Sequence, residues 1–257
     1  MTLDSAFLIT LFLVFVRVSA SLLVSPVFGG TVPMQIRIFA CMAFSLSLAP
    51  VVQPMIGQMP DTIGELVMAT AAQAASGIVL GLCLHLVVYA FQMAGTLLDV
   101  QVGLSSVSVF NPLSQQHVTL LGNLKMWLSI VLLLSFNGHH LIFRSLVESY
   151  GLTLDVELGK IAITTLLGKM SLLALQIAAP VASAALIVDV ASGFINKTIP
   201  QMQVYMVAMP AKIILGVTAL MLSLPMLAGA VNAGVEHAYE EISTMFVAPK
   251  GGPADGR

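Results

Sequence analysis

Long apolar segments alternate with short stretches of polar residues, proline and glycine along the whole chain. At about 1.5 Å of rise per residue, roughly 20 apolar residues in a helix cross a hydrocarbon layer. The pattern predicts six helices, at residues 6–25, 35–52, 65–94, 120–136, 161–194 and 210–230, of which five or six could span a membrane. We therefore expect an all-α fold, in which the third helix is longer than a bilayer requires.

Several of the predicted helices contain residues that interrupt regular structure. Residues 137–140 end the fourth helix before a short apolar continuation at 141–147, Pro180 breaks or bends the fifth, and Pro225 lies near the end of the sixth. Irregular backbone at membrane depth is tolerated only where protein or a water-filled cavity surrounds it. The interruptions therefore predict packing against partner subunits or around a pore.

Composition places these helices in a membrane. Of the 257 residues, 58% are hydrophobic and only 9% are Asp, Glu, Lys or Arg, against about 25% charged residues in a typical soluble domain. Charge this sparse indicates a multi-pass integral membrane protein. The net charge of −2 and the lack of any basic run exclude a nucleic-acid partner. Cys41 and Cys83 lie in apolar segments and are expected to be small buried side chains.

The sequence contains no motif for soluble-type catalysis or for binding a cofactor or metal. It has no Gly-x-Ser-x-Gly elbow, no phosphate-binding loop and no His-Glu-x-x-His zinc motif. We therefore expect no enzymatic activity, no catalytic residues and no cofactor.

Ionisable side chains inside apolar helices are energetically unfavourable, so each is a functional candidate. Arg17 and Asp189 are the clearest, followed by His85, Lys169 and Lys212. They could form an ion relay or a substrate site, or they could fix packing between helices or subunits. Because no helix carries a repeat of acidic and basic groups, the packing interpretation is favoured.

Gly77 and Gly81 form a Gly-x-x-x-Gly pair flanked by alanines. Small residues at this spacing allow two helices to approach closely. The pair could form a docking face for another chain or pack internally, and both interpretations stay open.

An uncharged segment between the third and fourth helices is the most informative feature. Residues 103–119 mix apolar side chains with serines, amides and an Asn-Pro pair. Such a segment could block an aqueous pore without binding strongly to what passes through it. The alternative is an ordinary surface loop.

Two motifs are similar to those of a known family. The first is Gly95 followed by Asp99-x-Gln101-x-Gly103 and then Asn111-Pro112; the second lies within residues 189–213. In both, the chain resembles the FliR family, the export-gate membrane proteins of flagellar type III secretion, which have counterparts in virulence injectisomes. The resemblance covers nearly the whole chain. It departs at Gln203 and Asn111, where the family commonly has Asn and often Asp, and both changes keep hydrogen-bonding capacity.

The resemblance implies an architecture that composition does not show. About six long, partly broken apolar helices would form a FliP-like plus FliQ-like unit within a helical hetero-oligomer. Residues 1–150 would be the FliP-like half with a plug loop at 103–116, residues 151–246 the FliQ-like half, and residues 247–257 a flexible tail. One copy would close the helical assembly and help to seal and gate a channel for unfolded secreted substrates.

The resemblance also implies partners and a location. The partners would be FliP-like and FliQ-like gate subunits, a FlhB-like switch protein, other export-apparatus proteins, unfolded substrates and membrane lipid. The chain would lie in the bacterial inner membrane, within the flagellar basal body. The motifs do not distinguish a flagellar system from an injectisome.

Two groups of site residues follow from the resemblance, taken together with the spacing arguments above. The expected gate or plug residues are Gly103, Leu104, Ser105, Ser106, Val107, Ser108, Val109, Phe110, Asn111, Pro112 and Leu113, with Phe110 as the bulky element. The expected assembly and packing residues are Arg17, Gly77, Gly81, Gly95, Asp99, Gln101, Asp189, Asn196, Lys197, Pro200, Gln201, Pro210 and Lys212.

The main alternative is a stand-alone multi-pass transporter of a small solute. It would bind its solute through Arg17 or Asp189, between broken helices at the bilayer midplane. Such a transporter should be stable alone, whereas an export-gate subunit should be recovered with its partners. An intramembrane hydrolase has no supporting motif.

Overall fold

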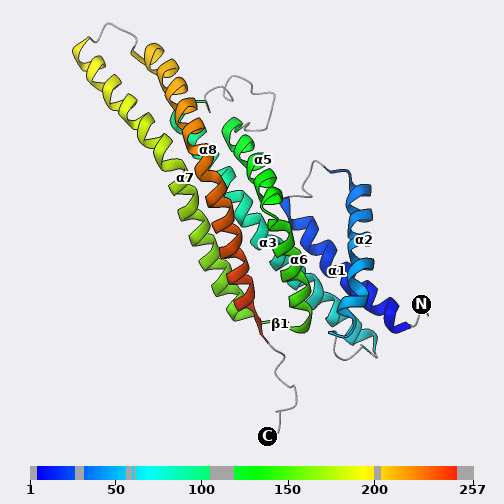
Figure 1. Cartoon of the computed structure of the whole chain (residues 1–257). Helices are drawn as coiled ribbons and strands as arrows, with labels where there is room; N and C mark the ends of the chain where they lie inside the picture. The colour runs from blue at the N-terminus through cyan, green and yellow to red at the C-terminus, as the bar shows by residue number, and fades with distance from the viewer. Residues whose placement is uncertain are drawn as a thin grey trace. The chain divides into compact units, whose positions relative to one another are not determined.

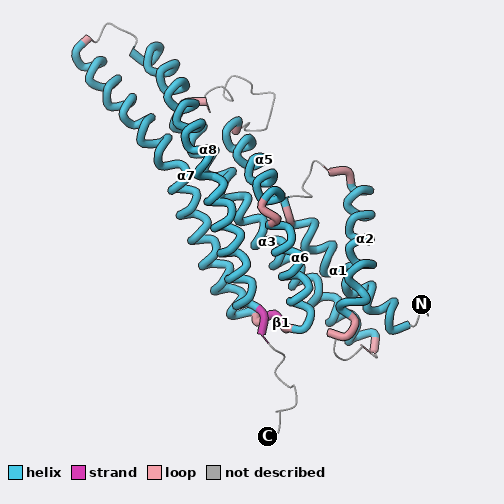
Figure 2. The backbone as a smooth tube through the Cα atoms, in the orientation of Figure 1, coloured by secondary structure: helices cyan, strands magenta, loops and turns pink. Residues whose placement is uncertain are grey.

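The computed structural model describes residues 5–26, 32–55, 60, 62–104, 119–199 and 204–247, and this part of the chain is almost entirely helical (Figures 1 and 2). Its α-helices are α1 (Ser5–Val24), α2 (Met34–Val52), α3 (Ile63–Val102), α5 (Leu120–Ser135), α6 (Gly138–Glu148), α7 (Val156–Thr198) and α8 (Val204–Met245). A 3-10 turn at Ser149–Gly151 and two short strands, β1 (Thr153–Leu154) and β2 (Phe246–Val247), complete it. The predicted all-α fold class is confirmed.

The helices are long and apolar, as expected for a membrane protein. Within the described ranges, α1, α2, α3 and α7 are each long and apolar enough to cross a membrane, and the bent α8 would make a fifth such helix. The helix α5 is apolar but has only 16 residues. The membrane prediction therefore holds, with α5 shorter than a full crossing.

Three helices are longer than the hydrophobic pattern predicted. The third helix continues to Val102, the fifth covers 156–198 and the sixth covers 204–245. The predicted ends were placed where apolar residues stop. In α7 and α8, a charged residue ends an apolar run without ending the helix, because Glu and Lys are good helix formers. Pro180 lies inside a continuous α7, so that helix is not broken there.

The predicted interruption at Pro225 corresponds to a bend. The two parts of α8, Ala208–Met221 and Ser223–Met245, meet at an angle of 53°. Pro225 has no N–H to donate to the carbonyl of Met221, four residues earlier, and its ring crowds that carbonyl. The bend lies in the turn that the proline disrupts.

The break between α5 and α6 also falls where the sequence placed it. Asn137 has a positive φ of 56°, a left-handed conformation that asparagine tolerates better than most residues. The chain therefore leaves α5 and starts the short helix α6 within two residues.

The chain divides into two compact units. Unit 1 comprises Met1–Leu86, Asn137–Leu167 and Val235–Arg257, and unit 2 comprises Val87–Phe136 and Gly168–Gly234. In unit 1, α1 packs against α2, and the antiparallel strands place Thr153 opposite Val247 and Leu154 opposite Phe246. Cys41 and Cys83 are buried and unbridged there. Each unit contains segments from both sequence halves. The division into two compact units therefore differs from the division into residues 1–150 and 151–246.

Unit 2 is built from residues 87–102 of α3, all of α5, and parts of α7 and α8. Its core contains the fully buried side chains of Phe91, Leu98, Met170, Val181 and Leu227. These side chains come from α3, α7 and α8, so the core of unit 2 joins all three helices.

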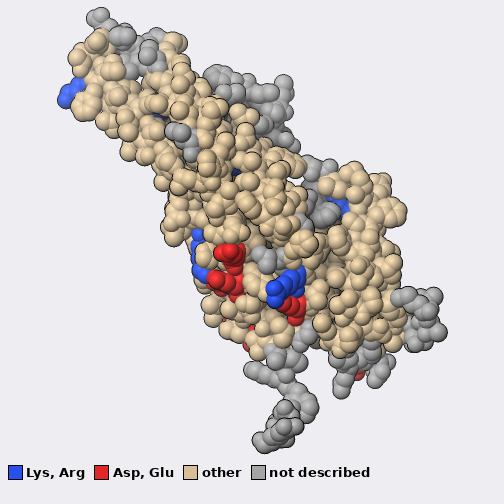
Figure 3. All heavy atoms as spheres, viewed as in Figure 1, with Lys and Arg blue, Asp and Glu red and all other residues tan. Residues whose placement is uncertain are grey.

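The molecular surface carries little charge. Figure 3 shows a face of mostly uncharged atoms, with a cluster of acidic and basic groups and a few separate ones. Exposed ion pairs of unit 1 join Arg144 to Glu148 and Lys160 to Glu157. The apolar remainder suits contact with lipid or with other subunits.

Candidate functional site

A cross-helix cap forms where α3 ends and α5 begins, in unit 2. Asp99, in the last turn of α3, is only 2% exposed. Its carboxylate oxygens accept hydrogen bonds from the backbone N–H of Leu121, at 3.0 and 3.1 Å, and from that of Gly122, at 3.2 Å. The first N–H groups of a helix lack partners within the helix. Asp99 therefore provides hydrogen-bond acceptors for these N–H groups of α5 from another helix. Its negative charge lies at the positive end of the α5 helix dipole.

Glycines bring the two backbones close enough for this cap. Gly95 lies one turn before Asp99 on the same face of α3, and a Cβ built there would lie 2.6 Å from the Cα of Gly122. A Cβ on Gly122 would in turn lie 2.7 Å from the hydroxyl of Thr119 and 2.8 Å from that of Thr96. The spacing of Gly95 and Asp99 in the first motif thus has a local physical reason.

The end of α3 is held on its other side by α8. Val102 is 1% exposed, and a Cβ built on Gly216 of α8 would lie 2.5 Å from Val102 Cγ2. Gly103 then adopts a positive φ of 85°, the left-handed conformation that commonly ends a helix. Both ends of the segment between α3 and α5 are therefore packed against other helices of unit 2.

The remaining residues of the first motif have simpler surroundings. Gln101 is exposed, while Gly103 and Leu104 are half-buried in the turn that follows α3. The other expected plug residues lie outside the described residues: Ser105, Ser106, Val107, Ser108, Val109, Phe110, Asn111, Pro112 and Leu113.

The second motif contains an ion pair between helices. Asp189 on α7 and Lys212 on α8 form this pair in unit 2, with side-chain exposures of 45% and 19%. Asn196 and Lys197 are exposed in the last turns of α7, where a lysine interacts favourably with the helix dipole. Pro210 is exposed within α8, and Pro200 and Gln201 lie outside the described residues.

Arg17 is buried in unit 1, with 3% of its surface exposed. Its Nη1 donates a hydrogen bond of 2.7 Å to Ser149 Oγ, and its guanidinium lies 4.2 Å from the centre of the Tyr150 ring. The Tyr150 hydroxyl donates to the Val14 carbonyl at 3.4 Å. Burial raises the pKa of Tyr150, which keeps the phenol neutral. Within the part of the chain that the structure describes, Arg17 has no carboxylate partner and is held by a hydroxyl and an aromatic face.

Gly77 and Gly81 pack against α1 within unit 1. A Cβ on Gly77 would overlap the Arg17 carbonyl and lie 2.9 Å from Ala20 Cβ. A Cβ on Gly81 would overlap the Ser21 carbonyl in the same way. Of the two interpretations left open by the sequence, the structure places these glycines in an internal helix contact.

Several contact residues had no signal in the sequence. Ser149 and Tyr150 lie more than 130 positions from Arg17 along the chain, and Gly216 lies 114 positions from Val102. Lys125 likewise has no sequence signal: it is 1% exposed, and its Nζ forms no hydrogen bond with any described residue. No local motif identifies such positions, because their partners come from distant helices.

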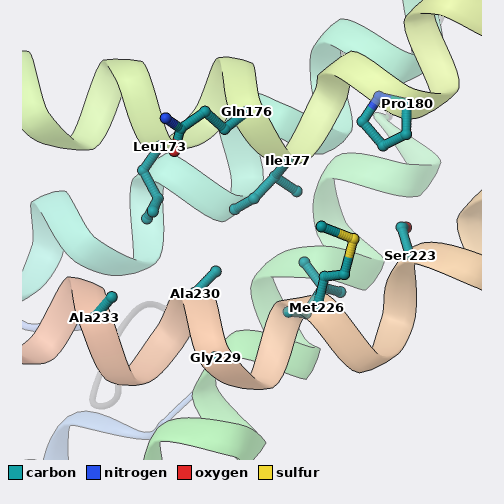
Figure 4. A pocket seen from close by; sticks show the side chains of 10 residues that line it. Leu173, Gln176, Ile177, Pro180, Ser223, Met226, Gly229, Ala230 and Ala233 are labelled. Atoms are coloured by element: carbon teal, nitrogen blue, oxygen red, sulfur yellow. The ribbon is translucent and has the colours of Figure 1, made fainter.

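A cavity of about 270 Å³ lies between α7 and α8 in unit 2 (Figure 4). Leu173, Ile177 and Pro180 line it from α7, opposite Met226 and Ser223 from α8. The Ser223 hydroxyl donates to the Leu220 carbonyl at 2.8 Å, so its proton is already used. The lining is therefore suited to apolar contact and not to acid–base chemistry. Among the described residues, no group of three or more His, Cys, Asp or Glu side chains could hold a metal ion.

The amino-acid sequence is similar to those of known bacterial proteins. Residues 8–238 match the family model described as bacterial export proteins, family 1. The chain is 32% identical to the flagellar biosynthetic protein FliR of Caulobacter vibrioides over 219 residues, which cover 82% of this chain and 87% of that protein. It is 31% identical to FliR of Bacillus subtilis, over 78% of this chain and 80% of that protein. For FliR of Escherichia coli the identity is 25%, with coverages of 90% and 88%.

The family-model match begins within α1, ends near the end of α8 and includes both motifs. They support a role in flagellar protein export, and the family is one of export-apparatus proteins and not of enzymes. The chain belongs to the FliR family of bacterial export proteins.

Proposed function

We propose that this chain is a core subunit of the flagellar type III export gate. It joins FliP-like and FliQ-like subunits in the bacterial inner membrane, within the basal body, and closes their helical assembly. FlhB-like and other export-apparatus proteins bind the same complex, and unfolded secreted proteins pass through it. Residues 1–150 form the FliP-like half, residues 151–246 the FliQ-like half and residues 247–257 a flexible tail.

One observation carries the gate proposal beyond family membership. The uncharged segment 103–116 is bounded by two helix ends that are both fixed: Val102 packs against Gly216, and Asp99 caps α5. A segment that plugs a pore needs anchored ends, because a free hinge would let it leave the pore at no cost. Its lack of charge suits a seal that must release every passing substrate.

The assembly and packing residues have the contacts that such a role requires. Gly77, Gly81 and Arg17 join α1 to its neighbours in unit 1, and the Lys212–Asp189 pair joins α7 to α8 in unit 2. Gating is passive: the plug and nearby apolar side chains exclude ions and move aside for substrate. The energy for transport comes from partner proteins.

Composition of the native complex tests the assembly. The tagged full-length chain is purified from its native membrane in mild detergent and analysed by intact-complex mass spectrometry. We expect one copy of this chain with several copies of two smaller membrane proteins. A stable monomer or homodimer that transports a solute in liposomes would replace the gate with a stand-alone transporter.

Ion conductance tests the plug. Deletion of residues 104–115 should leave the complex assembled and make the membrane leak ions. Unchanged conductance in an assembled deletion variant would refute the plug assignment.

A further inference from the structure

We propose that the cavity between α7 and α8 binds one acyl chain of a membrane phospholipid. The inference goes beyond the proposed export role and does not depend on it. The cavity lies wholly within unit 2, and none of its lining residues belongs to either sequence motif.

The cavity lies at the depth of the hydrocarbon layer. Residues 170–188 of α7 and residues 213–235 of α8 contain no charged side chain. Residues 170–188 rise about 28 Å as a helix, close to the roughly 30 Å thickness of a hydrocarbon core. Every residue that lines the cavity falls inside one of these two uncharged stretches. At this depth a bilayer offers acyl chains, and neither headgroups nor water.

The cavity is continuous with an apolar outer surface. Its lining includes Met226, which is 68% exposed, as well as the buried side chains of Ile177 and Leu227. It therefore extends inward from the surface of unit 2. Leu172 and Leu175, beside the lining residues of α7, are more than half exposed. Since α7 is long and apolar enough to cross a membrane, a lipid chain on this surface can enter the cavity directly.

The lining selects an apolar ligand. Among the described residues that line the cavity, none is charged, and Gln176 and Ser223 are the polar ones. Gln176 is exposed, and the Ser223 hydroxyl already donates to the Leu220 carbonyl at 2.8 Å. Apolar cavities in proteins stay dry and bind apolar molecules. Hydrocarbon therefore suits this cavity better than water does.

The volume of about 270 Å³ sets the size of the ligand. A water molecule takes about 30 Å³ in the liquid, and a methylene group is of similar size, so roughly nine such groups fit. An acyl chain provides them in one continuous segment. A leucine from a neighbouring helix provides only an isobutyl group, so a single inserted side chain leaves most of the space empty.

Small residues of α8 create the space. In Figure 4, Ala230 and Ala233 on α8 lie across the cavity from Leu173 and Ile177 on α7. Nothing lies within 4 Å of the Cβ position at Gly229, in the same wall. Atoms that line an empty space lose the van der Waals partners that a packed interior gives them. A bound acyl chain supplies these partners and joins α7 to α8 below the surface.

Photolabelling of the full-length chain tests the proposal. The protein is reconstituted in vesicles of phosphatidylethanolamine and phosphatidylglycerol that contain a phospholipid with a diazirine in its acyl chain. Irradiation in the vesicles should label the cavity residues Ile177 and Leu227 and also Leu186 and Ile187, which are 61% and 70% exposed on α7. After exchange into detergent and then irradiation, label should persist in the cavity and fall to background at Leu186 and Ile187. Equal loss at all four positions would show surface lipid only and overturn the proposal.

Variants that fill the cavity should exclude the lipid. Gly229→Leu and Ala233→Leu should each lower the retained label at Ile177 by about tenfold, because the new side chain occupies the space of the acyl chain. Gly193→Leu on α7 is the matched control: its Cβ position is also open, and it does not line the cavity. Its label should equal that of the wild type. Wild-type labelling in a folded filling variant contradicts the proposal. If neither filling variant folds, the detergent-exchange comparison on the wild type decides.

The native complex tests the competing occupant. Benzoylphenylalanine in place of Met226 puts a photoreactive group at the edge of the cavity, and irradiation of native membranes should yield a phospholipid adduct. A crosslink to another protein at this position, without a lipid adduct, would replace the acyl chain with a partner segment and overturn the proposal.

Discussion

The ammonium group of Lys212 on α8 forms an ion pair with the carboxylate of Asp189 on α7. Both residues belong to one sequence motif, yet they are 23 positions apart and lie on two different helices. Lys212 is four-fifths buried along its side chain, while Asp189 remains nearly half exposed. The pair therefore connects the two long helices of unit 2 at a partly shielded position.

Reversing this pair should measure its contribution. We expect Asp189→Lys and Lys212→Asp each to lower the thermal stability of the purified protein, and the double reversal to recover part of the loss. The coupling energy should be about 1 kcal/mol, the upper range for exposed pairs, because Lys212 is shielded. Thermal unfolding of the wild type, the two single variants and the double variant in the same detergent gives the stabilities needed for a double-mutant cycle. Strictly additive losses would show that the two charges do not interact.

Gly216 should not tolerate a side chain while Val102 is present. A Cβ there would lie 2.5 Å from Val102 Cγ2, so Gly216→Ala should destabilise unit 2 by about 1–3 kcal/mol through overpacking. Val102→Ala in the same protein should relieve part of that loss. Gly229→Ala on the same helix is the control, because nothing lies within 4 Å of its Cβ position. Equal melting temperatures for the Gly216 and Gly229 variants would contradict the contact.

In unit 1, Gly77 should be as sensitive to an added side chain as Gly216 is in unit 2. Gly77→Ala would drive a methyl group into the Arg17 carbonyl, and a helix backbone cannot move aside as a side chain can. We expect a loss of about 1–3 kcal/mol, measured as thermal stability or as the yield of monodisperse protein. Gly64→Ala on the same helix has open space around its Cβ and should gain slightly through helix propensity. A stable Gly77 variant would show that α1 and α3 are further apart.

Removal of the Ser149 hydroxyl should destabilise the Arg17 site. Ser149→Ala leaves the buried Nη1 without its acceptor, and an unsatisfied buried donor of this kind costs about 1–3 kcal/mol. Tyr150→Phe keeps the ring under the guanidinium and loses only a hydrogen bond of 3.4 Å to Val14, so its effect should be smaller. Chemical or thermal unfolding of the two variants shows which of them is less stable. The reverse order would place the main support of Arg17 elsewhere.

Acid should weaken the exposed ion pair between Arg144 and Glu148 on α6. A hydrogen bond of 2.8 Å from Arg144 lowers the pKa of Glu148 below its usual 4.5. A depressed carboxylate pKa contributes stability above the unfolded-state value, and that contribution is lost as pH falls through the folded-state pKa. Wild type should therefore lose slightly more stability than Glu148→Gln when acidified below about pH 4.5. The difference should be small because Glu148 is exposed. Identical acid profiles for both proteins would show that Glu148 does not contribute to the acid sensitivity.

The position of each helix could be inferred from local pattern. Apolar runs located α1, α2 and α5 closely, since lipid-facing and core-facing residues are both apolar and water-facing loops are not. The same pattern ended α3, α7 and α8 too early. In α7 and α8 the reason is that Glu and Lys continue a helix as readily as apolar residues do. Asn137 and Pro225 were identifiable as interruptions from their backbone chemistry alone.

The meaning of the motif residues depended on the tertiary structure. Gly95 and Asp99 could be singled out by their spacing, but their partners Leu121 and Gly122 belong to another helix. Gly77 could equally have served an external partner, and only packing shows that α1 occupies its face. Helix formation follows from short-range hydrogen bonds and residue preferences that repeat every few positions, so the chain's order of residues is sufficient for it. Cross-helix caps, ion pairs and glycine contacts join residues far apart in the chain, so they are decided only when the helices pack.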